Sequence, residues 1–162
     1  MTARTALAAA ALFALAACTA EPQTAQTAPT TATTSPAPTE SAGVNCADAP
    51  QDVVAAALRL RLNHSRQSIV DNVVTCTYDG GGAQVRFTTG ADAASFARRR
   101  AEHRDAVDVP GFRDEAYRTT TTSGEVVRTV VVARRGTVEI EVSSGANTGH
   151  AEQLVSELFA RL

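Results

Sequence analysis

The chain has 162 residues, of which 15 are basic and 17 are acidic, so its formal net charge is −2. A charge this close to neutral gives no support for nucleic-acid binding. No apolar run reaches the about 20 residues that a membrane-spanning helix needs, which argues against a chain held in the bilayer by such helices.

The first 17 residues have the pattern of a secretory signal. Residues 1–4 carry the amino terminus and one arginine, and residues 5–17 form an uncharged run of 13 residues that is mostly Ala and Leu. A run of this length is too short to span a bilayer and fits the apolar part of a signal peptide. We therefore expect residues 1–17 to be removed from the mature protein.

Leu15, Ala16 and Ala17 precede Cys18, and this order of residues resembles the lipobox of bacterial lipoproteins. The resemblance implies that the Cys18 thiol receives a diacylglycerol and that Cys18 becomes the first residue after cleavage. Two acyl chains, such as palmitate, hold a protein stably on a membrane, whereas one chain binds only marginally. The alternative is an ordinary secretory signal followed by a chance cysteine.

Residues 18–45 form a linker between the lipidated cysteine and the rest of the chain. Thr, Ala, Pro and Ser supply 20 of the 27 residues from 19 to 45, and no aromatic residue occurs there. Such a composition cannot bury enough apolar surface to offset the entropy of ordering. We therefore expect residues 18–45 to be a disordered, Thr/Pro/Ala-rich linker.

Two cysteines, Cys46 and Cys76, remain once Cys18 is assigned to the lipid. An even pair in a domain outside the cytoplasm is typical of a disulfide. Two free buried thiols or a metal pair are the alternatives, and the metal pair is weak because no His or third Cys lies at ligand spacing. We predict a Cys46–Cys76 disulfide that links the first helix to the sheet.

Residues 46–162 have the usual size of one domain. The expected helices are 50–62, 92–105 and a last one after Asn147; the expected strands are 73–78, 83–88, 114–122, 125–133 and one around 137–142, with a short strand near 68–70. Two blocks of strand, turn, strand and helix follow each other at an offset of 55 residues. We expect an α+β domain in which about three helices pack on one face of a twisted antiparallel sheet.

Two of these elements have a clear buried face. Val138, Ile140 and Val142 are expected to point inward, with Thr137, Glu139 and Glu141 in solvent. The last helix has the strongest helical periodicity in the chain. Its expected apolar face consists of Ala151, Leu154, Val155, Leu158, Phe159 and Leu162.

The sequence contains no recognisable catalytic constellation. His64, His103 and His150 are scattered, and neither a His-Glu-x-x-His nor a Gly-x-Ser-x-Gly element occurs. The arginine runs at 98–100 and 134–135 could bind an anionic group, although runs this short are usually exposed helix or turn. We therefore expect a non-catalytic protein with no cofactor and no metal.

One segment, residues 109–117, mixes a Pro-Gly turn, two aromatics and three charges. The interpretation that we favour is structural: a crossover between the two halves, with Phe112 and Tyr117 placed over the core. The alternative is that this segment lines a ligand cleft.

Several of these features together resemble a known family. They are Cys46 ahead of a helix, Cys76-Thr77-Tyr78 in a strand, a central Gly-Phe-Arg-Asp-Glu-Ala-Tyr from Gly111 to Tyr117, a Val-rich hairpin and a last amphipathic helix. This layout is similar to that of small actinobacterial cell-envelope lipoproteins with a domain of unknown function. The resemblance implies a twisted antiparallel sheet with helices and no established enzyme activity.

We therefore expect a lipoprotein on the extracytoplasmic face of the cell membrane. Its domain would bind a small molecule, a lipid or an envelope protein, and not nucleic acid. The alternatives are a structural or accessory subunit of an envelope assembly or transporter, and a hydrolase with an unrecognised site. An apolar pocket between sheet and helices would favour a small ligand, a flat apolar patch a protein, and a cleft with perturbed acids near Glu139 an enzyme.

Overall fold

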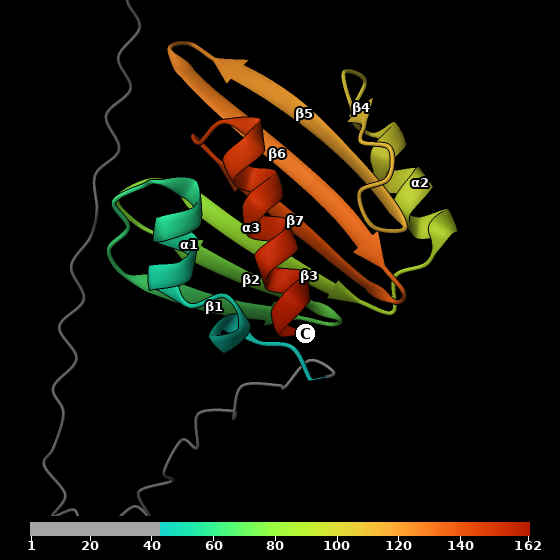
Figure 1. The fold of residues 1–162 in the computed structure, drawn as a ribbon, viewed down its shortest axis with the longest axis horizontal. Coiled ribbons are helices and arrows are strands. Elements are labelled where there is room, and N and C mark those ends of the chain that lie inside the picture. The colour runs from blue at the N-terminus through green and yellow to red at the C-terminus, as the bar shows by residue number, and fades with distance from the viewer. Residues whose placement is uncertain (1–42) are drawn as a thin grey trace, which may run out of the picture. The chain divides into compact units, whose positions relative to one another are not determined.

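The computed structural model describes residues 43–162, which form a seven-stranded antiparallel sheet with three α-helices (Figure 1). The predicted signal peptide, the lipobox of Leu15, Ala16, Ala17 and Cys18, and the linker up to residue 42 lie outside the described residues. The elements are η1 (Cys46–Asp48), α1 (Gln51–Leu58), β1 (Ser65–Val70), β2 (Val73–Tyr78), β3 (Ala83–Thr89), α2 (Ala93–Ala101), β4 (Val107–Asp108), β5 (Glu115–Ser123), β6 (Val126–Arg135), β7 (Val138–Ser144) and α3 (Thr148–Arg161). The predicted α+β class is confirmed.

The strand order is β1-β2-β3-β7-β6-β5-β4, so the two halves of the chain meet where β3 pairs with β7. Val85 lies opposite Val142 there, and Phe87 lies opposite Ile140. These four side chains are buried, because β-branched and aromatic residues pack well on a pleated surface. The two central strands, β3 and β7, therefore contribute buried side chains to the main core.

Helices α1 and α3 cover one face of the sheet and lie in front of it in Figure 1. The Asn147 side chain accepts a hydrogen bond from the His150 amide and so starts α3, as predicted. Five of the six residues predicted for the apolar face of α3 are buried: Ala151, Leu154, Val155, Leu158 and Phe159. The sixth, Leu162, is 42% exposed because α3 ends at Arg161.

Helix α1 is shorter than the predicted 50–62. It ends at Leu58 because Arg59 adopts the left-handed conformation (φ 54°), and its amide closes the last turn onto the carbonyls of Ala55 and Ala56. Leu60 and Leu62 still pack against the main core, from an extended segment. Leu60 and Leu62 therefore face the core as a helix would require, although they lie beyond the end of α1.

The predicted disulfide is confirmed: Cys46 and Cys76 are bonded and join η1, which precedes α1, to β2. Next to it, the Tyr78 hydroxyl donates a hydrogen bond to the Ala49 carbonyl. Burial raises the pKa of Tyr78 to about 12, so this donor keeps its proton at physiological pH. A covalent and a polar link therefore hold the start of α1 on the sheet.

Helix α2 lies on the opposite face of the sheet from α1 and α3. Its Phe96 packs with Val130 and Val132 of β6, whereas Val131 and Ala133 of the same strand belong to the main core. Neighbouring residues of a strand point to opposite faces, so the two clusters lie on opposite sides of β6. The prediction that all helices share one face is thus correct for α1 and α3 and wrong for α2.

The remaining boundaries differ in small ways. Helix α2 ends at Ala101 instead of residue 105, and β1 begins at Ser65, three residues before the predicted short strand. Arg134 and Arg135, predicted as a turn, are the last residues of β6. No helix among the described residues is long and apolar enough to cross a membrane.

Candidate functional site

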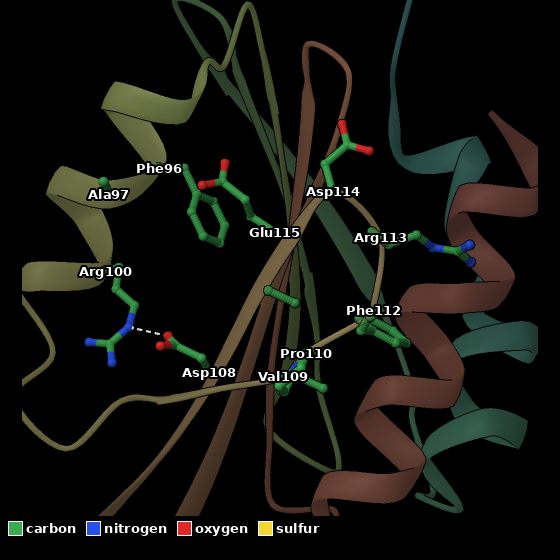
Figure 2. Close-up of a pocket in the computed structure, with 12 residues that line it drawn as sticks. Phe96, Ala97, Arg100, Asp108, Val109, Pro110, Phe112, Arg113, Asp114 and Glu115 are labelled. Atoms are coloured by element: carbon green, nitrogen blue, oxygen red, sulfur yellow. Dashed lines mark hydrogen bonds and ion pairs between the residues drawn. The ribbon is translucent and has the colours of Figure 1, made fainter.

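A groove of about 480 Å³ lies between α2 and the segment that leads into β5 (Figure 2). Phe96, Ala97 and Arg100 of α2 line one side, and residues 108–116 line the other. This volume is within the range of pockets that hold small molecules. We call it the α2 groove and take it as the candidate site.

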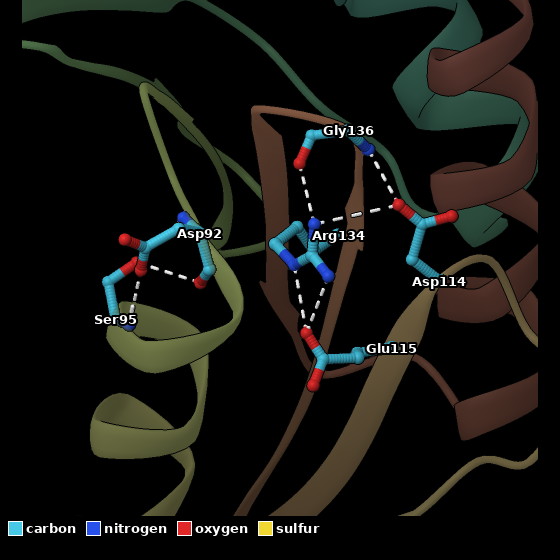
Figure 3. Close-up of polar contacts among 6 residues, drawn as sticks. All are labelled: Asp92, Ser95, Asp114, Glu115, Arg134 and Gly136. Atoms are coloured by element: carbon cyan, nitrogen blue, oxygen red, sulfur yellow. Dashed lines mark hydrogen bonds and ion pairs between the residues drawn. The ribbon is translucent and has the colours of Figure 1, made fainter.

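The α2 wall is positioned by a cap and one buried aromatic side chain. The Asp92 carboxylate accepts the Ser95 amide at 2.7 Å, and the Ser95 hydroxyl oxygen accepts the Asp92 amide at 2.9 Å (Figure 3). The hydrogen bond from the Ser95 amide stabilises the carboxylate and is the largest cause of the lowered pKa of Asp92, and the Ser95 side chain adds to it. One turn into the helix, the Phe96 ring meets the Tyr117 ring edge-on at 5.4 Å between centroids.

The opposite wall is a folded segment. The Val109 amide donates to the Ala116 carbonyl at 2.9 Å, and the Asp114 amide donates to the Arg134 carbonyl at 3.0 Å. Gly111 takes a left-handed conformation (φ 75°), which glycine adopts without a steric penalty. Phe112 packs against the main core. Both interpretations of residues 109–117 therefore apply. The segment is a crossover that packs on the core, and it also lines a cleft.

Arg134 holds the end of this segment from within the sheet (Figure 3). Its guanidinium donates twice to one Glu115 oxygen, at 2.9 and 2.7 Å, and once to the Gly136 carbonyl at 2.6 Å. It also lies 3.5 Å from an Asp114 oxygen, which accepts the Gly136 amide at 2.7 Å. The Arg134 side chain is only 13% exposed, so its guanidinium is largely shielded from solvent where it holds the two acids at the groove.

The two arginines that line the groove, Arg100 and Arg113, are also engaged. Arg100 donates to an Asp108 oxygen at 2.6 Å and to the Ala106 carbonyl at 2.7 Å. Figure 2 shows Arg113 directed toward α3, where it donates to the Ser156 carbonyl at 3.2 Å. Within the arginine runs at 98–100 and 134–135, Arg99, Arg100 and Arg134 therefore already have acidic partners.

Glu139 corrects the prediction for β7, because it is 1% exposed instead of solvated. Helix α2 covers this face of the sheet, and one Glu139 oxygen accepts a hydrogen bond from Arg99 of α2. The other oxygen has no partner among the described residues. Burial raises the pKa of Glu139, and the Arg99 charge opposes that shift only in part. Glu141, on the same face, is half-buried and lies 3.8 Å from Arg86.

Changing Glu139 to glutamine is expected to remove a loss of folding stability that the wild type shows as the pH rises from acidic to neutral. The folded-state pKa of Glu139 lies above its ordinary value of 4.5, so the unfolded chain loses this proton first as pH rises. Wild-type stability therefore falls across that window, by at most about 1.4 kcal/mol per pH unit, and the E139Q variant lacks this loss. Urea unfolding of both proteins from acidic to neutral pH measures the difference. Stability curves that stay parallel would contradict the assignment.

The histidines do not gather into a site, as expected from their spacing. His64 is exposed, His150 is half-buried in the first turn of α3, and neither lines the α2 groove. The His103 ring lies 5.6 Å from the Tyr117 ring, measured between their centroids. Within residues 43–162, no group of three or more His, Cys, Asp or Glu side chains is arranged to hold a metal ion.

The sequence indicates one wall of the groove and gives no sign of the other, α2. Residues 109–117 stand out by their mixture of turn, aromatic and charged residues. The Arg99–Glu139 pair joins residues 40 positions apart, and no local pattern marks it. A usable signal was the apolar run from Val130 to Ala133, because a strand buried on both faces must be covered on both.

The chain matches no family model, and a search of characterised proteins finds no match. One solved structure is similar, a GTP binding regulator from Thermotoga maritima, at 15% identity and a TM-score of 0.33. The match covers 70% of this chain and 88% of that chain. A similarity at this level supports no inference about this chain's function.

Proposed function

We propose that this protein is a lipid-anchored envelope protein whose folded domain binds a small ligand in the α2 groove. Support for the anchor is the order of features in the leader: a charged start, an apolar run, then Leu15, Ala16, Ala17 and Cys18. Support for ligand binding is one observation. A groove of ligand size is walled by a helix and a folded segment that are each held in place by their own polar contacts.

Binding is favoured over hydrolysis by the position of the perturbed acid. A catalytic role for Glu139 would require that its carboxyl group lie in a cleft. Glu139 lies beneath α2, is paired with Arg99, and does not line the α2 groove. A flat protein-binding patch is less well supported, because the exposed large apolar residues are spread over three strands and the end of α3. They are Val70 on β1, Val107 on β4, Val126 and Val127 on β6, and Leu162 after α3.

Changing Ala97 to phenylalanine is expected to abolish ligand binding while leaving the fold intact. Ala97 is exposed on α2 and lines the groove, so the larger side chain fills the space that a ligand needs. Its matched control is A94F, at an exposed alanine one turn earlier that does not line the groove. The two variants have the same helix-propensity cost, so any difference between them reports the groove.

A fragment screen by amide chemical shifts makes this measurable on the full chain. Fragments should perturb the amides of Ala97, Gly111 and Glu115 in the wild type and in A94F. In A97F the same fragments should bind at least about ten-fold more weakly, which corresponds to about 1.4 kcal/mol. Fragments that gather at another surface, or that bind A97F as well as A94F, would refute the groove as the binding site.

A further inference from the structure

We infer that the α2 groove selects a ligand that carries an organic cation, such as an amine, on an apolar or aromatic body. This inference rests on the proposed function, since it assigns a ligand class to the same groove. It follows from which hydrogen-bonding groups of the groove are already used and which are not.

Arg100, which lines the groove, and Arg134, which lies next to it, are both paired with acids of the protein itself. Arg134 has acceptors for its Nε and both terminal nitrogens, on Glu115, Gly136 and Asp114. Arg100 is bonded to Asp108 and the Ala106 carbonyl, and its guanidinium also lies 6.0 Å from the Tyr117 ring centre. An anionic ligand would have to compete with Asp108 and Glu115 for these guanidinium groups, and displacing either acid leaves a carboxylate unpaired.

Arg113 lines the groove, but its guanidinium is directed away from α2. It adopts a left-handed backbone (φ 63°), and its guanidinium lies 5.7 Å from the Phe112 ring centre and 5.4 Å from that of Phe159. Together with the bond to the Ser156 carbonyl, these contacts direct its charge toward α3 (Figure 2). It therefore does not offer a positive charge to a ligand beside α2.

The negative groups, in contrast, have hydrogen-bonding capacity to spare. Asp108, Asp114 and Glu115 each use one carboxylate oxygen in a protein contact, and the second oxygen has no hydrogen-bond partner among residues 43–162. Their side chains are 70%, 48% and 35% exposed. Three acids and two arginines, Arg100 and Arg113, line the groove, so the charge balance of its lining is −3 + 2 = −1. The groove can thus offer negatively charged carboxylate oxygens to a ligand that donates hydrogen bonds.

The shape of the groove makes an organic cation a better match than a metal ion. The three carboxylates do not form a cluster that could hold a metal in the described part of the chain. Between them the groove offers apolar surface from Phe96, Val109 and Pro110. A ligand with a donor group at one end and an apolar body satisfies both parts of this lining.

The test compares three probes that share a phenyl body and differ in charge: 2-phenylethylamine, 2-phenylethanol and 3-phenylpropionate. The full chain with Cys18→Ala is titrated with each, and binding is followed by amide shifts at Ala97, Gly111 and Glu115. The amine is expected to bind at least about ten-fold more tightly than the alcohol, and the carboxylate more weakly than either. High salt should weaken the amine alone.

A pair of variants assigns the preference to the groove carboxylates. Asp114→Asn keeps an oxygen for the Gly136 amide and removes the charge, so amine affinity should fall about three-fold, within the range of exposed ion pairs. The alcohol should bind this variant and the wild type alike. Asp105→Asn, at an exposed acid outside the groove, is the matched control and should change neither affinity.

The possible failures separate the two proposals. If the alcohol or the carboxylate binds in the groove as tightly as the amine, or if D114N leaves the amine affinity unchanged, the cation preference is wrong and the groove remains a binding site. If all three probes perturb amides elsewhere, or none perturbs the groove up to its solubility limit, both proposals fail.

Discussion

Replacing Cys18 by alanine is expected to move essentially all of the protein from the membrane fraction to the soluble fraction. The thiol is the only part of Leu15-Ala16-Ala17-Cys18 to which diacylglycerol can be attached. Transfer of each buried CH₂ of an acyl chain contributes about 0.8 kcal/mol, so two chains dominate membrane affinity. Detergent-phase partition and membrane fractionation measure the change, and mass spectrometry of the same samples reports the lipid.

The matched control uses the other two cysteines. A protein with Cys46→Ala and Cys76→Ala keeps Cys18 and should stay in the membrane fraction, because its anchor is unaffected. Retention of the Cys18→Ala variant on membranes would contradict the lipid anchor. A wild type that carries no lipid mass and appears in the soluble fraction would mean that the leader is an ordinary secretory signal.

The same double replacement of Cys46 and Cys76 is expected to lower the free energy of unfolding by about 3.6 kcal/mol. The bond closes a loop with a sequence separation of 30 residues, and its loss returns the corresponding loop entropy to the unfolded chain. Because a domain of this size is stable by only about 5–15 kcal/mol, the change is a large fraction of the total. Urea unfolding followed by circular dichroism measures it.

Chemical reduction of the wild type provides the control for altered packing. Cys76 is completely buried, so its replacement by alanine also removes a packed sulfur atom, whereas reduction leaves both sulfurs in place. The reduced wild type should therefore lose slightly less stability than the double variant. A loss below about 1 kcal/mol in both would show that the link between η1 and β2 does not constrain the fold.

Much of the fold could be predicted because its signals are local. The spacing of Leu154, Val155 and Leu158 specifies the buried face of α3, and alternation specifies that Ile140 and Val142 point into the main core. The turn residues at 79–82 and the Gly at 136 separate the strands that pair. Each of these features depends on residues close in sequence, so the chain alone determines it.

The position of α2 could not be predicted because its signal is not local. Phe96 is the single buried side chain of α2. One apolar residue does not specify which face of the sheet the helix packs against. The apparent repeat of strand, turn, strand and helix suggested that α2 and α3 lie on the same side. The burial of Glu139 follows from this difference, because α2 covers the face on which Glu139 lies.

The candidate site shows the same division. Residues 109–117 were recognised from composition, whereas the contribution of Arg134 depends on the β5–β6 register, which places it opposite Glu115. Whether a charged side chain faces a ligand or its own neighbours is decided by such registers. The distinction between occupied guanidinium groups and unsatisfied carboxylates therefore required the structure.

Native mass spectrometry of the protein extracted from its own membrane tests the central claim most directly. The account predicts a chain that begins at a diacylated Cys18, lacks two hydrogens because of the Cys46–Cys76 bond, and carries a small ligand that A94F retains and A97F loses. A ligand that remains on A97F as fully as on A94F would contradict the claim that the α2 groove is the binding site.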